Sequence, residues 1–259
     1  MSALAIENGI YRTPPTKIGW FARQFPSLTF HCKFLGIVYR ASRAARRGQY
    51  DQQEWFASCS KILRALESVG VQIEVTGLEH LDRVERPCLV VGNHMSTLET
   101  VVLPVLLQQL EPLTFVVFSK LIEVPVFRDV MRSLSPVVVR QESAREDFKI
   151  MLQEGADRVE RGMTLVVFPE GDRMPAFTPA KFNTIGVKLA ARTSAPLVPV
   201  AIQSDAWPMG GPFSYLGRIY PERRVRIAFG TPMFVEGRGA DAQAAIINFI
   251  EKQIAEWVE

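Results

Sequence analysis

The chain has 259 residues, of which 47% are hydrophobic and 22% are charged. This is the composition of an ordinary globular protein, which excludes disordered and fibrous architectures. Its 30 basic and 27 acidic residues leave a net charge of +3, which is too small to predict binding to nucleic acid. Three widely spaced cysteines without a metal-binding pattern predict reduced thiols, and the first residues show no secretory signal. We therefore expect a chain that stays on the cytoplasmic side.

The first 50 residues differ from the rest in charge. They hold eight basic residues and one acidic residue, whereas the remaining 209 hold 22 basic and 26 acidic residues. Aromatic residues crowd positions 20–39, and Arg40, Arg43 and Arg47 follow at helical spacing. Aromatic residues beside a basic helix face are typical of a helix that lies in a membrane surface. The alternative is a helix docked on the core with a solvated basic face.

No stretch of the sequence predicts a clean membrane span. A transmembrane helix needs about 20 mostly apolar residues. The two nearest candidates, 26–42 and 100–118, are interrupted by charged residues or prolines. We therefore expect residues 1–50 to be a peripheral or monotopic anchor at the cytoplasmic face of a membrane, and residues 51–259, which contain no linker, to form one catalytic domain.

Beyond residue 50, short β-branched runs alternate with segments of helical period, which indicates an α/β fold. An amphipathic helix is expected over 51–69, a second begins at the capping box of Ser143 and Glu146, and a last one carries the apolar residues from Ile246 to Trp257. The expected fold is a mixed, largely buried sheet flanked by helices, with an N-terminal helical segment that associates with a membrane. Its strands are predicted at 71–75, 88–92, 114–118, 136–140, 164–168, 196–202 and 224–229.

Of the three histidines, His94 lies where catalysis would place one. It directly follows an apolar strand, at the edge of the sheet where α/β proteins bind ligands. Ser96 and Glu99 have capping-box spacing, so a helix is expected to begin after His94, which would let the two side chains meet. Neutral His94 would then accept a proton while Glu99 fixes its tautomer. The plainer interpretation is a capping glutamate beside a locally bonded loop histidine.

A second charged turn is expected at the same edge. Residues 166–173 read Val-Val-Phe-Pro-Glu-Gly-Asp-Arg, in which a buried strand ends in Glu170, Gly171 and Arg173. Because the carboxyl ends of parallel strands share one edge, this turn and the His94 loop should converge.

These motifs together resemble the glycerophospholipid acyltransferases typified by lysophosphatidic acid acyltransferase. The first family motif is a histidine followed after four residues by an aspartate, which His94 and Glu99 match with glutamate in place of aspartate. The Phe-Pro-Glu-Gly-Thr-Arg motif is matched over 168–173 except at Asp172. Residues 198–202 look like the fourth motif, and three residues resemble the second: Lys120, Pro125 and Arg140. The resemblance spans 88–202 in the family's order, which makes it more specific than any single motif.

The resemblance implies transfer of a fatty acyl group from a thioester of coenzyme A or acyl carrier protein to a lipid hydroxyl, as in phospholipid biosynthesis. His94 would be the general base and Glu99 would orient it, without a metal or other cofactor. The implied partners are a membrane surface, a lysophospholipid acceptor and, as an alternative donor, acyl carrier protein. The residues expected to bind substrate are Asn93, Ser96, Lys120, Arg140, Glu170, Gly171 and Arg173. Surface charge is an equally good interpretation of Lys120 and Arg140.

Two departures from the family pattern leave alternatives open. Glu99 adds one methylene to the dyad, and Asp172 places a carboxylate beside the arginine expected to hold the acceptor's phosphate. A hydrolase that uses the same base on a thioester, and an inactive lipid-binding relative, both remain alternatives. The sequence leaves open the acceptor headgroup, the acyl chain length, the donor and the oligomeric state.

Overall fold

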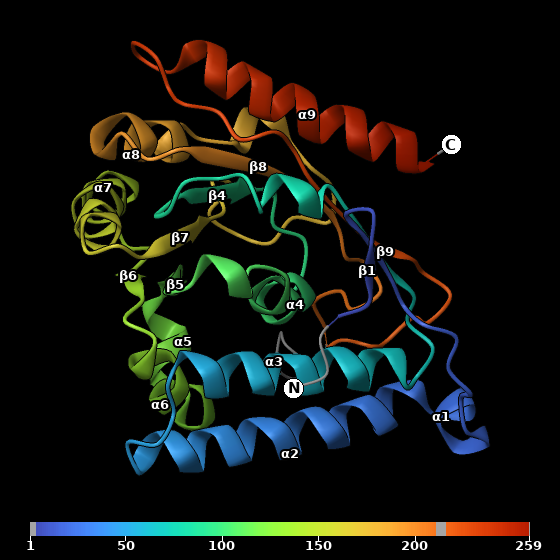
Figure 1. Ribbon diagram of the computed structural model, residues 1–259. Coiled ribbons are helices and arrows are strands. Elements are labelled where there is room, and N and C mark those ends of the chain that lie inside the picture. Colours follow the sequence, from blue (N-terminus) through green and yellow to red (C-terminus); the bar gives the residue numbers. More distant parts are fainter. Residues whose placement is uncertain (1–3, 211–215, 259) are drawn as a thin grey trace.

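The computed structural model describes residues 4–210 and 216–258, in which one mixed sheet lies between two layers of helices (Figure 1). Its nine strands have the order β1-β2-β3-β9-β8-β4-β7-β5-β6. The five neighbours from β8 to β6 are parallel, whereas β9 is antiparallel to β8 and β1 and β2 form an antiparallel hairpin. The strands are β1 (Ile6–Glu7), β2 (Ile10–Arg12), β3 (Ile73–Thr76), β4 (Leu89–Gly92), β5 (Leu113–Phe118), β6 (Val137–Val139), β7 (Thr164–Val167), β8 (Leu197–Gln203) and β9 (Val225–Phe229).

Helices cover both faces of this sheet, and each layer has its own apolar core. Helices α3 and α4 lie on one face with α2 and α6 beyond them, while α7, α8 and α9 lie on the other (Figure 1). The helices are α1 (Trp20–Gln24), α2 (Pro26–Arg46), α3 (Gln52–Glu67), α4 (Leu98–Leu106), α5 (Ser119–Glu123), α6 (Pro125–Ser133), α7 (Ala144–Glu160), α8 (Ile185–Thr193) and α9 (Ala240–Val258).

The predicted α/β architecture is confirmed, and each of the seven predicted strands is present with its ends shifted by at most two residues. Three short helices, α5, α6 and α8, were not predicted, because five to nine residues give little more than two turns of periodicity. The candidate span at 100–118 divides into the end of α4 and strand β5. No helix among the described residues is both long enough and apolar enough to cross a bilayer.

The predicted helix starts have a clear local cause. The Asp51 carboxylate accepts a hydrogen bond from the backbone N–H of Glu54 at 2.9 Å, which caps α3. The Ser143 hydroxyl accepts one from the N–H of Glu146 at 3.4 Å, which caps α7. Both interactions are short-range, which is why the sequence alone located these helices.

The first 50 residues contribute to the same sheet and core as the rest of the chain. Tyr11 in β2 pairs with Val75 in β3, and Phe30 and Phe34 of α2 are fully buried. Arg46 of α2 also forms an ion pair with Asp129 of α6 at 2.7 Å. The segment is therefore docked along one face, while its opposite face exposes apolar and basic side chains.

Candidate active site

Strands β4, β7 and β8 are parallel and end side by side, which places three loops at one edge of the sheet. Gly92 ends β4 where a side chain could not fit, because a Cβ there would lie 2.4 Å from the backbone oxygen of Val200. The next residue, Asn93, is fully buried and exchanges two hydrogen bonds with the backbone of Ile202, at 2.8 and 2.9 Å. Asn93 thus fastens the His94 loop to β8 and does not line a binding surface.

His94 lies on this loop, four residues before α4 begins, and its side chain meets Glu99. The His94 Nδ1 and Glu99 Oε1 atoms are 2.9 Å apart. The imidazole also stacks on the ring of Phe168, with centroids 4.3 Å apart and planes 9° from parallel. The ring is therefore held by a carboxylate at one nitrogen and by an aromatic face, while 13% of the side chain stays exposed. Nε2 is left to accept a proton at the open side.

The Glu99 carboxylate is fully buried and surrounded by hydrogen-bond donors. Oε1 accepts from the backbone N–H groups of Met95 and Ser96 at 2.6 and 2.7 Å, and Oε2 accepts from the hydroxyls of Ser96 and Ser204 at 2.8 and 2.6 Å. Burial by itself raises the pKa of Glu99, but the His94 bond and charge, followed by the bonds from Ser204 and Ser96, hold it below the usual value. Glu99 is therefore ionised, and His94 carries its hydrogen on Nδ1.

Glu170 braces the His94 loop through backbone hydrogen bonds. Its Oε2 accepts from the N–H of His94 at 2.8 Å, and its Oε1 accepts from the N–H of Thr178 at 3.4 Å. On the other side of His94, the carbonyl oxygen accepts from the N–H of Met174 at 2.7 Å. Burial raises the pKa of Glu170, and the two N–H groups offset this only in part. The two loops expected to converge are therefore joined at His94 itself.

Arg173 lies beside the dyad on the same turn. Its Nη1 donates to the hydroxyl of Thr97 at 2.8 Å, and burial lowers its pKa although Asp172 and Glu99 act in the opposite direction. Asp172 is exposed, and its carboxylate accepts the backbone N–H of Arg173 at 2.8 Å. Gly171 has a φ of +75° in the exposed turn, and its N–H bonds to Phe168. The turn therefore places a half-buried guanidinium next to an exposed carboxylate.

The other residues expected to bind substrate are placed differently. Ser96 is fully buried and its hydroxyl is committed to Glu99 and to the N–H of Leu98. Lys120 is exposed on α5, directly after β5, and Arg140 is exposed after β6. Because β5 and β6 are the outer strands on this side, these two cations lie farther along the same edge than the dyad.

Three residues at the dyad were missed by the sequence analysis: Ser204, Phe168 as a stacking partner, and Thr97. Ser204 follows the last residue of β8, so its position at a strand end was the only local signal. Its contact with Glu99 joins residues 105 positions apart, which no periodicity encodes.

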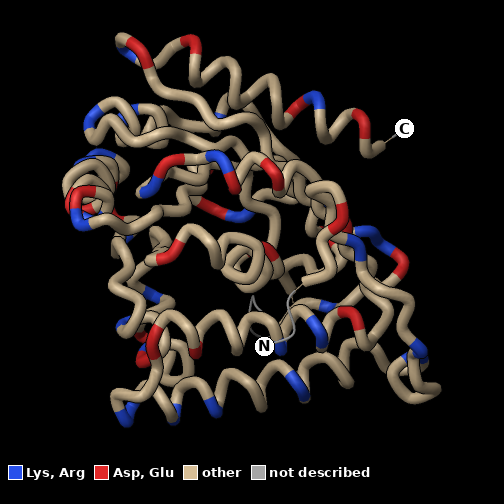
Figure 2. Tube along the Cα trace, viewed as in Figure 1, with Lys and Arg blue, Asp and Glu red and all other residues tan. Residues whose placement is uncertain are grey.

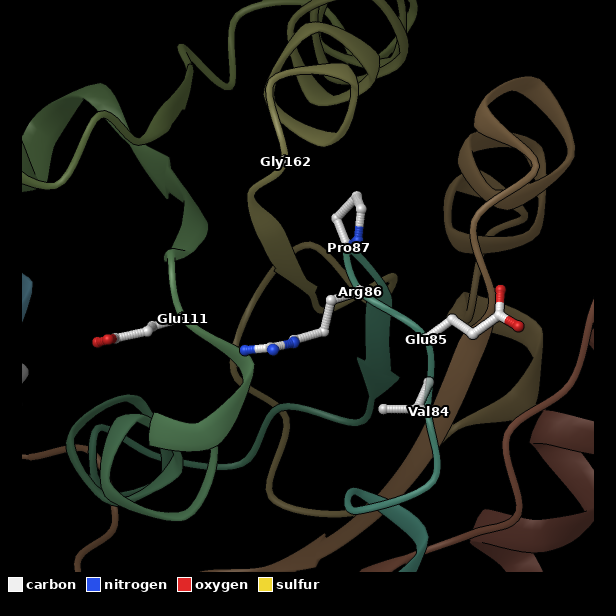
Figure 3. A pocket seen from close by; sticks show the side chains of 6 residues that line it. All are labelled: Val84, Glu85, Arg86, Pro87, Glu111 and Gly162. Carbon is white, nitrogen blue, oxygen red and sulfur yellow. The ribbon is translucent and has the colours of Figure 1, made fainter.

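The opposite edge of the sheet has a shallow cavity of about 750 Å³ (Figure 3). Its lining residues precede β4, β5 and β7, so it lies at the amino ends of these strands. Figure 3 shows the side chains of Arg86 and Glu85 pointing in opposite directions, and Arg86 donates to the carbonyl of Gln109 at 2.9 Å. Among the described residues, no group of three or more His, Cys, Asp or Glu side chains could hold a metal ion at either edge.

Comparisons with known proteins identify the family of this chain. Residues 72–203 match the protein family described as Acyltransferase. A 1-acyl-sn-glycerol-3-phosphate acyltransferase of Pseudomonas aeruginosa is 29% identical over 211 residues, which are 81% of this chain and 77% of that protein. A chloroplastic 1-acyl-sn-glycerol-3-phosphate acyltransferase of Brassica napus is 27% identical over 129 residues, which are 50% of this chain and 36% of that protein.

The fold is shared with a protein of known structure. The crystal structure of the 1-acyl-sn-glycerophosphate acyltransferase of Thermotoga maritima has a TM-score of 0.66 and 20% sequence identity, with 89% of this chain and 94% of that chain covered. The family match itself spans half of the chain and contains both loops that meet at His94. With its dyad and its third-motif turn inside the matched region, this chain belongs to the acyltransferase family.

Proposed function

We propose that this acyltransferase moves a fatty acyl group from an acyl thioester to a hydroxyl of a lysophospholipid of the 1-acylglycerol-3-phosphate type, with His94 as general base. The observation that carries the proposal is the His94–Glu99 contact. An ionised, fully buried Glu99 fixes the hydrogen of His94 on Nδ1, so Nε2 can accept a proton. The curated relatives, which are named for this reaction, support the same acceptor class.

The proposed reaction balances with the side chains present. Nε2 of His94 takes the proton of the acceptor hydroxyl as its oxygen bonds to the thioester carbonyl carbon. The resulting tetrahedral intermediate collapses, the carbon–sulfur bond breaks, and the departing thiolate takes the proton back from the imidazolium, which Glu99 stabilises in the meantime. The proposed reaction uses no cofactor, since the acyl donor is a substrate.

In this proposal Arg173 binds the anionic headgroup of the acceptor. It lies on the turn that carries Glu170 and is fixed by its bond to Thr97, one residue before α4. A guanidinium can hold a phosphate by two parallel hydrogen bonds. Asp172, one residue away, disfavours a dianionic phosphate, so a panel of headgroups is needed to define the acceptor.

The test measures thiol release from acyl-CoA and from acyl carrier protein with a panel of lysolipids and with no acceptor. Release that depends on a lysolipid and falls by about 10²–10⁴-fold in His94→Ala is expected for a general base. His80→Ala is the matched control, because His80 lies on the short helical turn after β3, outside the site. Release that needs no lysolipid would favour the hydrolase, and no release from any donor would favour the inactive lipid-binding relative.

We also propose that α1 and α2 lie on the surface of a membrane. Leu28, Leu35 and Tyr39 form one exposed stripe of α2, with exposed fractions of 55%, 44% and 62%, and Trp20 on α1 is 72% exposed. Lys33 and Arg40 lie seven positions apart on a neighbouring face of α2, and Arg47 follows directly after the helix ends. Figure 2 shows the Lys and Arg positions along α2, which contains no acidic residue. Such a helix suits the interface of an anionic membrane.

The other, buried face of α2 packs against the segment that follows Ser204. Trp207 lies three residues beyond Ser204 and packs edge-on against Phe30 and Phe34 of α2, with ring centroids 4.7 and 5.2 Å apart. A membrane bound along the exposed face of α2 would lie on the far side of this contact, and we propose that it extends to the edge of the sheet where the dyad is found. The protein would then be peripheral and would take its acceptor directly from the lipid.

Vesicle binding tests this proposal with substitutions and not with a deletion, because removing the segment would also remove β2 and the buried Phe30 and Phe34. Trp20→Ser combined with Leu28→Ser should abolish sedimentation with phosphatidylglycerol vesicles, and Arg40→Gln combined with Arg47→Gln should weaken it by several-fold. Phe234→Ser, which changes an exposed aromatic residue far along the chain, is the control. Unchanged sedimentation of both double variants would refute the membrane role.

A further inference from the structure

Glu99 has two oxygens with different surroundings. All donors to Oε1 belong to one stretch of chain, residues 94–96, so this oxygen is held by its own loop. Oε2 accepts only hydroxyl donors, from Ser96 at 2.8 Å and from Ser204 at 2.6 Å. Ser204 is therefore the one donor to this carboxylate, among the described residues, that comes from a distant part of the chain.

We infer that Ser204 is a positioning residue that holds the second carboxylate oxygen of Glu99 and thereby keeps Glu99 aligned on His94. The inference deepens the proposed function, since it assumes that the dyad carries out the proton transfer. Ser204 touches neither substrate nor the reacting atoms and acts through Glu99.

The Ser204 hydroxyl donates its hydrogen to Glu99 Oε2. Ser204 is fully buried, and the only other hydrogen-bond contact of its hydroxyl among the described residues is with the Ser96 hydroxyl oxygen at 3.0 Å. Ser96 accepts from the N–H of Leu98 at 2.9 Å and donates its own hydrogen to Glu99 at 2.8 Å. Each hydroxyl has a single hydrogen, so when both point to Oε2 the carboxylate has its full set of donors. A buried carboxylate that loses one of them is destabilised, because water cannot replace the bond.

The length of the glutamate side chain makes this contact specific. An aspartate at position 99 would withdraw the carboxylate by about 1.5 Å, the length of one carbon–carbon bond. The hydrogen bonds at Oε2 are already 2.6 to 2.8 Å long, so the shorter side chain could not reach both His94 and Ser204. The contribution of Ser204 should therefore depend on a glutamate at position 99.

Kinetics of four variants test the inference: Ser204→Ala, Ser204→Cys, Glu99→Asp and the double variant of Ser204→Ala with Glu99→Asp. We expect Ser204→Ala to lower kcat by about ten-fold with both KM values within two-fold of wild type. The acidic limb of its rate–pH profile should move to higher pH, because a carboxylate that has lost a donor holds the dyad proton more tightly. Ser204→Cys, which keeps the size and a weak donor, should recover part of the rate. In the Glu99→Asp background the same Ser204→Ala change should cost less than two-fold.

Ser42→Ala is the matched control, because Ser42 is also buried but lies in α2. It should leave kcat and the pH profile unchanged. The inference is overturned if Ser204→Ala has the kcat of wild type, if its loss of rate comes without a change in the pH profile, or if the loss is equally large in the Glu99→Asp background.

A spectroscopic measurement separates this inference from the proposed function. The His94 proton shared with Glu99 should give a downfield imidazole N–H signal in proton NMR, assigned by its disappearance in His94→Ala. Ser204→Ala should move this signal upfield or broaden it, whereas an unchanged signal refutes the inference regardless of activity. If the signal changes while His94→Ala retains full turnover, the positioning role stands and the general-base proposal fails.

Discussion

Two glutamates are buried in the described part of the chain, Glu67 and Glu99, and their charges are compensated in different ways. Glu67 at the end of α3 is 3% exposed and binds the Tyr11 hydroxyl and the Arg64 guanidinium, the latter at 3.0 Å. Glu99 at the sheet edge is fully buried and binds two hydroxyls, two backbone N–H groups and an imidazole. The partners of Glu67 have fixed charges at neutral pH, whereas His94 can gain and lose a proton.

The pKa values of Tyr11 and Arg64 show that the partners of Glu67 keep fixed charges. Burial raises the pKa of Tyr11, so its hydroxyl stays protonated beside Glu67. Burial by itself lowers the pKa of Arg64, but the hydrogen bond and charge of Glu67 outweigh burial and raise the pKa above its usual value. Tyr11 and Arg64 therefore both keep their protons at neutral pH. Burial of a carboxylate therefore does not by itself indicate a reactive site. A buried carboxylate whose partner can change its charge does indicate one.

Glu99→Gln should have the largest effect and tests whether Glu99, unlike Glu67, is needed for turnover. The amide cannot supply the charge that stabilises the imidazolium, and its NH₂ group has no acceptor where two backbone N–H groups already point. We expect a loss of turnover on the order of 10²–10⁴-fold. Steady-state thiol release measures it, and circular dichroism checks the fold. Turnover within five-fold of wild type would mean that Glu99 is only a helix cap.

Glu67→Gln should lower stability and leave turnover nearly unchanged. It removes a carboxylate from the Tyr11–Arg64 cluster, so the free energy of unfolding should fall by about 1–3 kcal/mol, while kcat stays within two-fold of wild type. Urea unfolding and thiol release measure the two quantities. Glu74→Gln, which removes an exposed carboxylate paired with Arg12, is the control and should change neither by much. A large loss of kcat without loss of stability would contradict the assignment of Glu67 to the fold.

The smallest expected effect is on the pH dependence of stability, and it compares Glu99 with Glu170 within the site. The pKa of Glu99 is lowered, so its stabilisation is present above the unfolded pKa of a glutamate, about 4.3, and is lost as the pH falls toward its folded value. The pKa of Glu170 is raised, so its ionised form costs stability that is regained as the pH falls through that value. Acid unfolding should therefore flatten in Glu99→Gln and steepen in Glu170→Gln. Equal slopes in both variants would refute the opposite signs.

Much of the site could be predicted because its signals are local. Each of three signals spans no more than eight residues: the strand before His94, the capping glutamate five residues after His94, and the charged turn after β7. The N-terminal hairpin was missed because β1 and β2 have two and three residues, which is too short for a pattern. Its pairing with β3 is decided by Tyr11 and Val75, 64 positions apart in the chain.

The sequence by itself determined the order of the longer helices and of the strands from β3 to β9, the position of His94 and the glutamate that contacts it, because periodicity and capping act over a few residues. Only the tertiary structure decided that Ser204 holds Glu99, that Phe168 stacks on His94, and that Glu170 binds the His94 backbone and not an exposed ligand. Each of these contacts joins segments that follow different strands at one edge of the sheet. Packing of the whole chain creates that proximity, so no local pattern could contain it.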